Sequence, residues 1–277
     1  MQEPKPQKNN TPPPIHLLNL KEKIIFKIVW FTNKYLNWYT ILHQRIVRFF
    51  FNRFFLRHTK TFNIESLAQY PKNSHIILAA NHRTYYDNFI VMTQLYNNHK
   101  RLPRRCLFPN RSTFYYDTFR GLFTNLIGTG LALFPPIYRQ RHQYKFNRFS
   151  MDYMVEQLCD KKGIIIAIHP EGTRNDSPDP YSLVKAKTGV GELAIKSPDS
   201  ILIPIFIHGL SNRLKQEIKY NYSRKSSSQV SVMFGEAIKL DDLRQQEHTK
   251  VTYRQATERW VAAINQLAQE HQKTQAE

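Results

Sequence analysis

The rest of the chain is interpreted from one stretch, which reads His75-Ile76-Ile77-Leu78-Ala79-Ala80-Asn81-His82-Arg83-Thr84-Tyr85-Tyr86-Asp87. Residues 75–80 form a short apolar run with polar bounds, which predicts a buried strand. Residues 88–96, which follow, are predicted to form a helix. His82 should therefore stand at the C-terminal end of a strand, and ligands bind at that edge in open α/β sheets.

His82 and Asp87 are candidates for two interacting side chains. Inside one helix, residues five apart would diverge by roughly 140°, because successive residues rotate by about 100°. For the two to touch, His82 must lie in the turn before the helix. Thr84 as N-cap, with Asp87 at the third helical position, would complete a Thr-x-x-Asp capping box and place Asp87 near the imidazole. The alternative is that Thr84 and Asp87 only cap a helix and that His82 is an ordinary loop histidine.

A second polar turn follows another predicted strand. Residues 163–168 are apolar and run directly into His169-Pro170-Glu171-Gly172-Thr173-Arg174. The two motifs, Asn-His-x4-Asp and Pro-Glu-Gly-Thr-Arg in this order, resemble those of the glycerolipid acyltransferase family, typified by lysophosphatidate acyltransferase. The resemblance covers approximately residues 62–240. It implies an α/β fold: a single acyltransferase domain with a mixed, mostly parallel central sheet flanked by helices.

The resemblance also implies catalytic roles for the first motif. His82 would deprotonate the acceptor's hydroxyl, Asp87 would orient it, and no covalent acyl-enzyme would form. Neutral histidine suits this task because its ordinary pKa of about 6.5 lies near the operating pH. A carboxylate on the other ring nitrogen can hold the imidazole in one tautomer.

The second motif would hold the acceptor. Arg174 provides a planar fork that fits a phosphate, and Gly172 allows close approach of the backbone. Glu171 would accept from a hydroxyl or hold Arg174 in place, with Thr173 beside it in the motif. The alternative is a glycine-containing turn with a local Glu171–Arg174 salt bridge. His169 departs from the family, which commonly has an aromatic or aliphatic residue there, and it lies close enough to titrate with the site.

Two further cations match the family's pattern. Arg139 corresponds to an arginine that contacts a phosphate, although Pro135-Pro136 blurs the register and leaves Arg141 as the alternative. Lys187, with Gly189, fits the family's Lys-x-Gly, and the alternative for Lys187 is plain solvent exposure. Cys106 and Cys159 have no C-x-x-C spacing and no histidine cluster nearby, so we expect no metal. We also expect no cofactor, only acyl-CoA or acyl-carrier protein as co-substrate.

The N-terminal region has a composition of its own. Residues 1–14 are polar and rich in proline, which predicts a disordered tail without a secretory signal. Residues 15–61 alternate aromatic and aliphatic groups with cations, and residues 62–277 would form the acyltransferase domain. Residues 1–60 contain eleven Lys or Arg against Glu3 and Glu22. This pattern predicts amphipathic helices in a membrane interface, and the alternative is a helical pair packed on the protein's own core.

Length and charge agree with an enzyme of this kind. The 277 residues suit one α/β domain with an appendage, and the formal charge of +19 predicts an anionic partner. The expected function is acylation of the free hydroxyl of lysophosphatidate to give phosphatidate, in phospholipid biosynthesis. The expected location is peripheral, on anionic lipid at the cytoplasmic side of a membrane. Other acceptors, such as another lysolipid or glycerol 3-phosphate, are alternatives, and so is a non-enzymatic protein that binds membranes or nucleic acid. No recognisable nucleic-acid motif supports the last of these.

Overall fold

The computed structural model describes residues 12–56, 58–98, 105–140, 143–160, 163–210 and 230–276, with parts of 213–219. The predicted tail thus lies outside the described residues up to residue 11. The elements up to residue 129 are η1 (Ile15–Leu17), α1 (Leu20–Tyr35), α2 (Asn37–Phe55), β1 (Thr59–Phe62), η2 (Ile64–Gln69), β2 (His75–Ala80), α3 (Asp87–Asn98), β3 (Cys106–Leu107), β4 (Asn110–Arg111), α4 (Ser112–Tyr115) and α5 (Phe119–Thr129). The later elements are β5 (Pro136–Ile137), α6 (Tyr144–Leu158), β6 (Ile164–Ile168), α7 (Gly189–Lys196), β7 (Ser200–His208), β8 (Val230–Phe234), α9 (Asp241–Arg244) and α10 (Lys250–Ala276).

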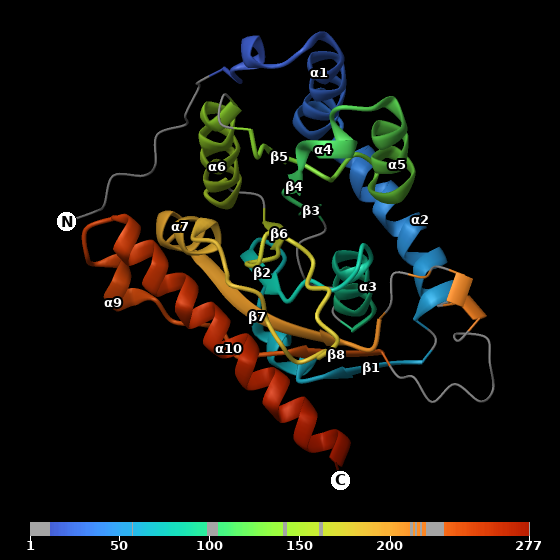
Figure 1. Ribbon diagram of the computed structural model, residues 1–277, viewed down its shortest axis with the longest axis vertical. Coiled ribbons are helices and arrows are strands. Elements are labelled where there is room, and N and C mark those ends of the chain that lie inside the picture. The colour runs from blue at the N-terminus through green and yellow to red at the C-terminus, as the bar shows by residue number, and fades with distance from the viewer. Residues whose placement is uncertain are drawn as a thin grey trace.

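A six-stranded sheet with the order β1-β8-β7-β2-β6-β3 forms the centre of the molecule. Neighbouring strands are parallel, except that β7 and β8 are antiparallel. Helices cover both faces, with α3 on one side and α7 and α10 on the other (Figure 1). The predicted fold class, a mixed and mostly parallel sheet flanked by helices, is confirmed. β4 and β5 form a separate parallel pair.

The two faces of the sheet carry separate cores, because neighbouring residues of a strand point to opposite faces. Ile76 of β2 packs with Leu95 of α3 on one face. Ile77, the next residue, lies on the other face in the core that contains Trp260 of α10. Burial on both sides explains why β2 is apolar throughout instead of alternating.

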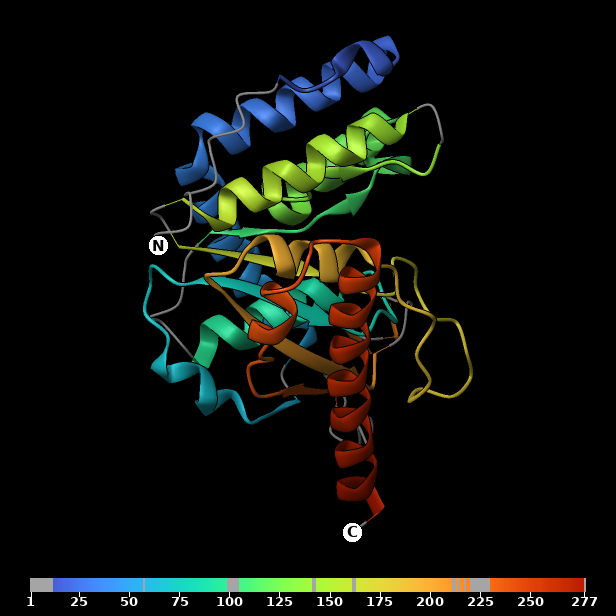
Figure 2. The same cartoon turned by 90° about the vertical axis from the view of Figure 1, so that its left-hand side faces the viewer.

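The N-terminal helices bury one face and expose the other. A capping box starts α1: the N–H of Glu22 donates to Asn19 Oδ1 at 3.0 Å, and the N–H of Asn19 donates to Glu22 Oε2 at 3.0 Å. Phe26 of α1 is fully buried in a core that it shares with Phe146 of α6. Figure 2 shows α1 and α6 side by side, at the end of the molecule far from the C-terminus.

The outer faces of these helices carry large apolar side chains. Those of α1 and α2 that are exposed include Leu20, Ile24, Ile28, Phe31, Trp38, Leu42, Ile46, Phe49 and Phe50, and those of α5 are Phe119, Phe123 and Ile127. None of the helices in the described part of the chain is long and apolar enough to cross a membrane.

Candidate active site

The two predicted polar turns meet because β2 and β6 are adjacent parallel strands. Ala79 pairs with Ile168, so both strands end at the same edge of the sheet. The backbone N–H of His82 donates to Glu171 Oε1 at 3.1 Å. In return, the N–H of Asn175 donates to the carbonyl oxygen of His82 at 2.7 Å. The edge of the sheet therefore joins residues from both motifs.

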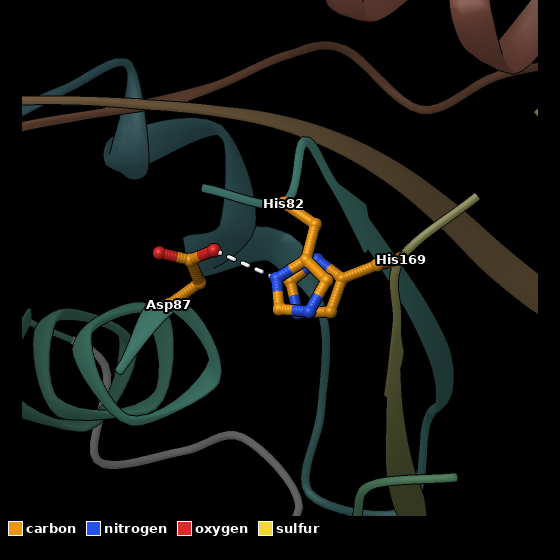
Figure 3. A group of neighbouring side chains, drawn as sticks. All are labelled: His82, Asp87 and His169. Atoms are coloured by element: carbon orange, nitrogen blue, oxygen red, sulfur yellow. Dashed lines mark hydrogen bonds and ion pairs between the residues drawn. The ribbon is translucent and has the colours of Figure 1, made fainter. Parts of the chain in front are cut away.

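His82 and Asp87 are in direct contact. Nδ1 of His82 lies 2.9 Å from Oδ2 of Asp87 (Figure 3). The Asp87 side chain is buried, whereas 22% of the His82 side chain is exposed. Asp87 also accepts from the N–H groups of Arg83 at 2.7 Å and Thr84 at 2.9 Å, and from the Thr84 hydroxyl at 2.5 Å. The carboxylate is thereby fixed with one oxygen on the imidazole.

The donors around Asp87 determine the charge of the pair. Burial alone would raise the pKa of Asp87, but the hydrogen bond from His82, the nearby His169 and the Thr84 hydroxyl together lower it. Asp87 is therefore a carboxylate, and Nδ1 of His82 donates to it. In a neutral ring this leaves Nε2 of His82 as the proton acceptor.

The predicted capping box is only partly formed. The N–H of Thr84 does donate to Asp87, but the Thr84 hydroxyl accepts from the N–H of Tyr86 at 3.1 Å. Because α3 begins at Asp87, this residue is the first helical position and not the third. The predicted position in the helix was wrong, whereas the predicted closeness of Asp87 to His82 is observed.

Glu171 links the two turns and does not pair with Arg174. Its Oε1 accepts from the N–H of His82, and its Oε2 accepts from the N–H of Val184 at 3.4 Å. Burial raises the pKa of Glu171, and these two N–H donors offset part of that effect. The Arg174 guanidinium lies over the ring of Tyr85, with Cζ 3.9 Å from the ring centroid. The local salt bridge considered above is therefore not the arrangement found.

Arg139 and Lys187 both lie beside Gly172. Nη2 of Arg139 donates to the carbonyl oxygen of Gly172 at 2.9 Å. Gly172 has a φ of +63°, a region that favours glycine, and a Cβ there would lie 3.3 Å from Cγ of Lys187. The N–H of Lys187 donates to the carbonyl oxygen of Pro170 at 2.8 Å. Both Arg139 and Lys187 are exposed residues, and their contacts with residues 170–172 place them beside the turn that follows β6.

Arg111 is a cation near this edge that the motifs did not indicate. It ends β4, and Arg139 follows β5, the strand paired with β4. Burial, and then repulsion from Arg111, lowers the pKa of Arg139. Two-residue strands leave no recognisable pattern in a sequence, so only the fold shows that these arginines are close. Thr173 is exposed, and the alternative cation Arg141 lies outside the described residues.

Arg83 is a second residue that the motifs did not indicate. Its Nη2 donates to the carbonyl oxygen of Ser177 at 2.7 Å, and its Nη1 donates to that of Asp179 at 3.2 Å. The guanidinium thus ties the loop after Arg174 to the turn that carries His82. The sequence contained no signal for this contact, because the partners are backbone carbonyls of a loop.

The group His82, Asp87 and His169 offers three possible metal-ligand atoms within 4.8 Å of one another. The two imidazoles are stacked, with centroids 4.0 Å apart and 9° between their planes. An imidazole lone pair lies in the plane of its ring, so two parallel rings do not direct their lone pairs at one ion. The oxygens of Asp87 already accept from His82, Arg83 and Thr84. This group suits proton transfer better than metal ligation.

The lowered pKa of His169 predicts that the protein loses stability in acid. Burial and the adjacent His82 lower the pKa of His169 to about 3, whereas the pKa of a histidine in the unfolded chain is about 6.5. Below about pH 6.5 the unfolded chain is protonated at this histidine, whereas the folded chain is not. The contribution of the neutral His169 to the free energy of unfolding is therefore complete above about pH 6.5 and is lost as the pH falls toward the pKa of the folded state. Between pH 7 and pH 5 we expect this residue to lower the free energy of unfolding by about 2 kcal/mol.

Urea unfolding of the protein and of His169→Phe at both pH values checks this expectation. Phenylalanine fills the same space and takes up no proton, so the variant should lose less stability between pH 7 and pH 5. Equal losses in the two proteins would show that His169 does not cause the acid sensitivity. Burial and the nearby His208 lower the pKa of His271 to about 4. His271 therefore adds the same pH dependence of stability to both proteins and does not affect the difference between their losses.

A comparison with known protein families matches more than half of the chain. The sequence model of a family described as Acyltransferase matches residues 61–208. Among the curated proteins, no sequence matches the chain. The matched segment runs from β1 to the end of β7 and contains both turns that meet at the sheet edge.

Proposed function

Because the chain belongs to the glycerolipid acyltransferase family, we propose that it moves a fatty acyl group from an acyl thioester to the free hydroxyl of lysophosphatidate, giving phosphatidate. The observation that carries this proposal is the His82–Asp87 pair. It presents an imidazole with Nε2 as proton acceptor at the C-terminal edge of the sheet. Arg139 and Arg174, which lie near the same edge, supply positive charge for a phosphate.

The reaction needs one base and no nucleophile from the protein. Nε2 of His82 takes the proton of the acceptor's hydroxyl as its oxygen attacks the thioester carbonyl. The carbon–oxygen bond forms, the carbon–sulfur bond breaks, and the imidazolium returns its proton to the leaving thiolate. Asp87 holds the ring through Nδ1 and stabilises the imidazolium while it exists, as the acid does in serine hydrolases.

The acceptor is proposed from the chemistry of the nearby cations. A guanidinium stacks on a ring through its face, which leaves the N–H groups along its edge for a phosphate. Arg174 stacks in this way on Tyr85, while Arg139 is held against Gly172. A phosphomonoester beside the attacking hydroxyl fits this arrangement and favours lysophosphatidate. Another lysolipid or glycerol 3-phosphate is the nearest alternative.

Product analysis tests the proposed acceptor directly. Purified protein is offered lysophosphatidate, lysophosphatidylcholine and glycerol 3-phosphate, each with acyl-CoA and with acyl-carrier protein, and products are identified by mass spectrometry. We expect phosphatidate as the main product. A preference for either of the other acceptors would replace lysophosphatidate as the substrate, and no acylation of any of them would contradict the proposed reaction.

The exposed faces of α1, α2 and α5 are proposed to lie on anionic membrane. Leu42, Ile46 and Phe49 follow one face of α2 at helical spacing and are 48%, 48% and 67% exposed. Arg45 and Arg48 lie between them in the sequence. Apolar side chains with interspersed cations suit an interface that offers acyl chains and negative headgroups. Such a position would bring a lipid acceptor to the enzyme.

Replacing Leu42, Ile46 and Phe49 together with serine should weaken binding to anionic vesicles at least about tenfold. Even a third of the roughly 1.5–3 kcal/mol for fully burying each side chain gives that factor. Co-sedimentation with phosphatidylglycerol vesicles measures the change. Substitution is preferable to deleting the helices, because α1 also buries Phe26 in the protein's own core.

Val251→Ser is the matched control, because Val251 is 65% exposed on α10, a different element. Binding should be unchanged in this variant. Unchanged binding in the triple variant as well would move the membrane contact away from α2.

A further inference from the structure

His169 lies directly against the proposed general base. It follows β6, and its ring overlies that of His82, with centroids 4.0 Å apart and 9° between the planes (Figure 3). A neutral histidine at this position offers one ring nitrogen as donor and the other as acceptor. The His169 ring can therefore interact with His82 electrostatically as well as through van der Waals contact.

The orientation of the His169 ring is fixed by backbone carbonyls. Nδ1 lies 3.0 Å from the carbonyl oxygen of Ala80 and 3.2 Å from that of Asn81. Carbonyl oxygens only accept, so Nδ1 carries the hydrogen. Burial and the neighbouring His82 lower the pKa of His169 to about 3, which keeps the ring neutral. Nε2 therefore holds the lone pair, and it is buried with no hydrogen-bond partner among the described residues.

The carbonyl groups that hold the His169 ring belong to the same segment as the general base. Ala80 and Asn81 are the two residues before His82, so the ring of His169 is tied to the backbone that carries the base. Asp87 holds one edge of the His82 ring, and His169 covers one of its faces. Rotation of the His82 ring away from Asp87 would break the stack as well as the hydrogen bond.

The stack also affects the charge that His82 acquires. A neutral imidazole has its negative end at the nitrogen with the lone pair, which is Nε2 in His169. In Figure 3 the Nε2 ends of both rings lie together, on the side of the stack away from the Asp87 contact. When His82 takes a proton at Nε2, the new positive charge therefore forms over the negative end of a ring that is already oriented. Dipoles oriented in advance stabilise such charge without reorganising.

We propose that His169 is a positioning residue for the general base, holding the ring of His82 toward Asp87 and stabilising the imidazolium that forms during turnover. This proposal rests on the proposed role of His82. His169 exchanges no proton itself: the hydroxyl proton moves to His82 and from there to the leaving thiolate. Its effect should appear in kcat, because the imidazolium exists only as the reaction proceeds.

Three variants separate the parts of this role. His169→Ala removes the ring and its dipole, His169→Asn keeps a donor for the carbonyls but no ring, and His169→Phe keeps a ring without the dipole. We expect kcat to fall about tenfold or more in the alanine and asparagine variants, less than the 10²–10³ typical for a donor on the reacting oxygen. The phenylalanine variant should lie between these and the natural protein. The KM values for both substrates should stay the same.

Several results would overturn the proposal. A raised KM with unchanged kcat would make His169 a substrate-binding residue. Equal kcat in the alanine and phenylalanine variants would mean that the stacked ring has no role. Melting temperatures are measured beside activity to show whether each variant folds. If the alanine variant does not fold, the phenylalanine variant provides the test, because its ring fills the same space. A kcat equal to that of the natural protein in this variant would show that the dipole of His169 does not stabilise the imidazolium.

A double-mutant cycle shows whether His169 acts through His82. Residues that act as a unit are strongly non-additive. Adding His169→Phe to His82→Ala should therefore cause no further loss, measured by product accumulation at high enzyme concentration. A further loss equal to that of His169→Phe alone would overturn the proposal. Failure of the base role itself is distinguishable, because His82→Ala alone would then keep its activity.

Discussion

Replacing His82 with alanine is expected to lower turnover by about two to four powers of ten, the usual contribution of a positioned general base. The fold should be retained, because Asp87 keeps its three other donors, from Arg83 and Thr84. The His82 side chain is also partly exposed, so no large cavity forms. Initial rates at saturating acceptor and donor measure kcat, and the melting temperature reports the fold.

His248→Ala is the control for this prediction. His248 is exposed between α9 and α10 and has a hydrogen bond with a backbone carbonyl, that of Arg244. Its replacement should leave turnover unchanged. A folded His82→Ala protein that keeps most of its activity would show that the hydroxyl loses its proton to another group, and the mechanism proposed above would be wrong.

Replacing Arg174 with alanine is expected to raise the KM for a phosphate-bearing acceptor by about 10- to 150-fold. This factor corresponds to the roughly 1.5–3 kcal/mol of a hydrogen bond to a charged group. Among the described residues no carboxylate forms an ion pair with Arg174, and its neighbour is the ring of Tyr85. The KM for the acyl donor should barely change.

Two further variants test how Arg174 acts. Arg174→Lys should recover little, because an ammonium group does not reproduce a two-pronged contact with phosphate. Arg254→Ala, which removes an exposed arginine from α10, is the control and should leave both KM values unchanged. An equal rise in the KM for an acceptor without a phosphate would show that Arg174 stabilises the turn or binds the acyl donor. The case for lysophosphatidate as the substrate would then lose its support from Arg174.

The site is assembled from segments that are distant in the sequence. His82 and Asp87 come from the end of β2 and the start of α3, whereas Glu171 and Arg174 follow β6. The N–H of His82 on Glu171, and the N–H of Asn175 on the carbonyl of His82, fasten the two segments together. A change in either turn should therefore affect the other.

Two strands of the sheet, β2 and β6, and the motifs that follow them can be recognised in the sequence alone. β2 and β6 are continuous apolar runs because they are buried on both faces, and a run of that kind is visible without a structure. The motif residues follow directly at the ends of these runs, so their place at the C-terminal edge could be predicted. The contact between His82 and Asp87 could be predicted as well, because it depends on residues only five apart.

Contacts between residues that are far apart in the sequence become visible only in the folded protein. The stacking of His169 on His82 requires β2 and β6 to be neighbours. The closeness of Arg111 to Arg139 requires two short strands to pair, and Arg174 lies on Tyr85 only because both turns reach the same edge. Periodicity reports which face of an element is buried, but it carries no information about which distant side chain lies opposite. That choice follows from strand order and packing, which depend on the whole chain at once.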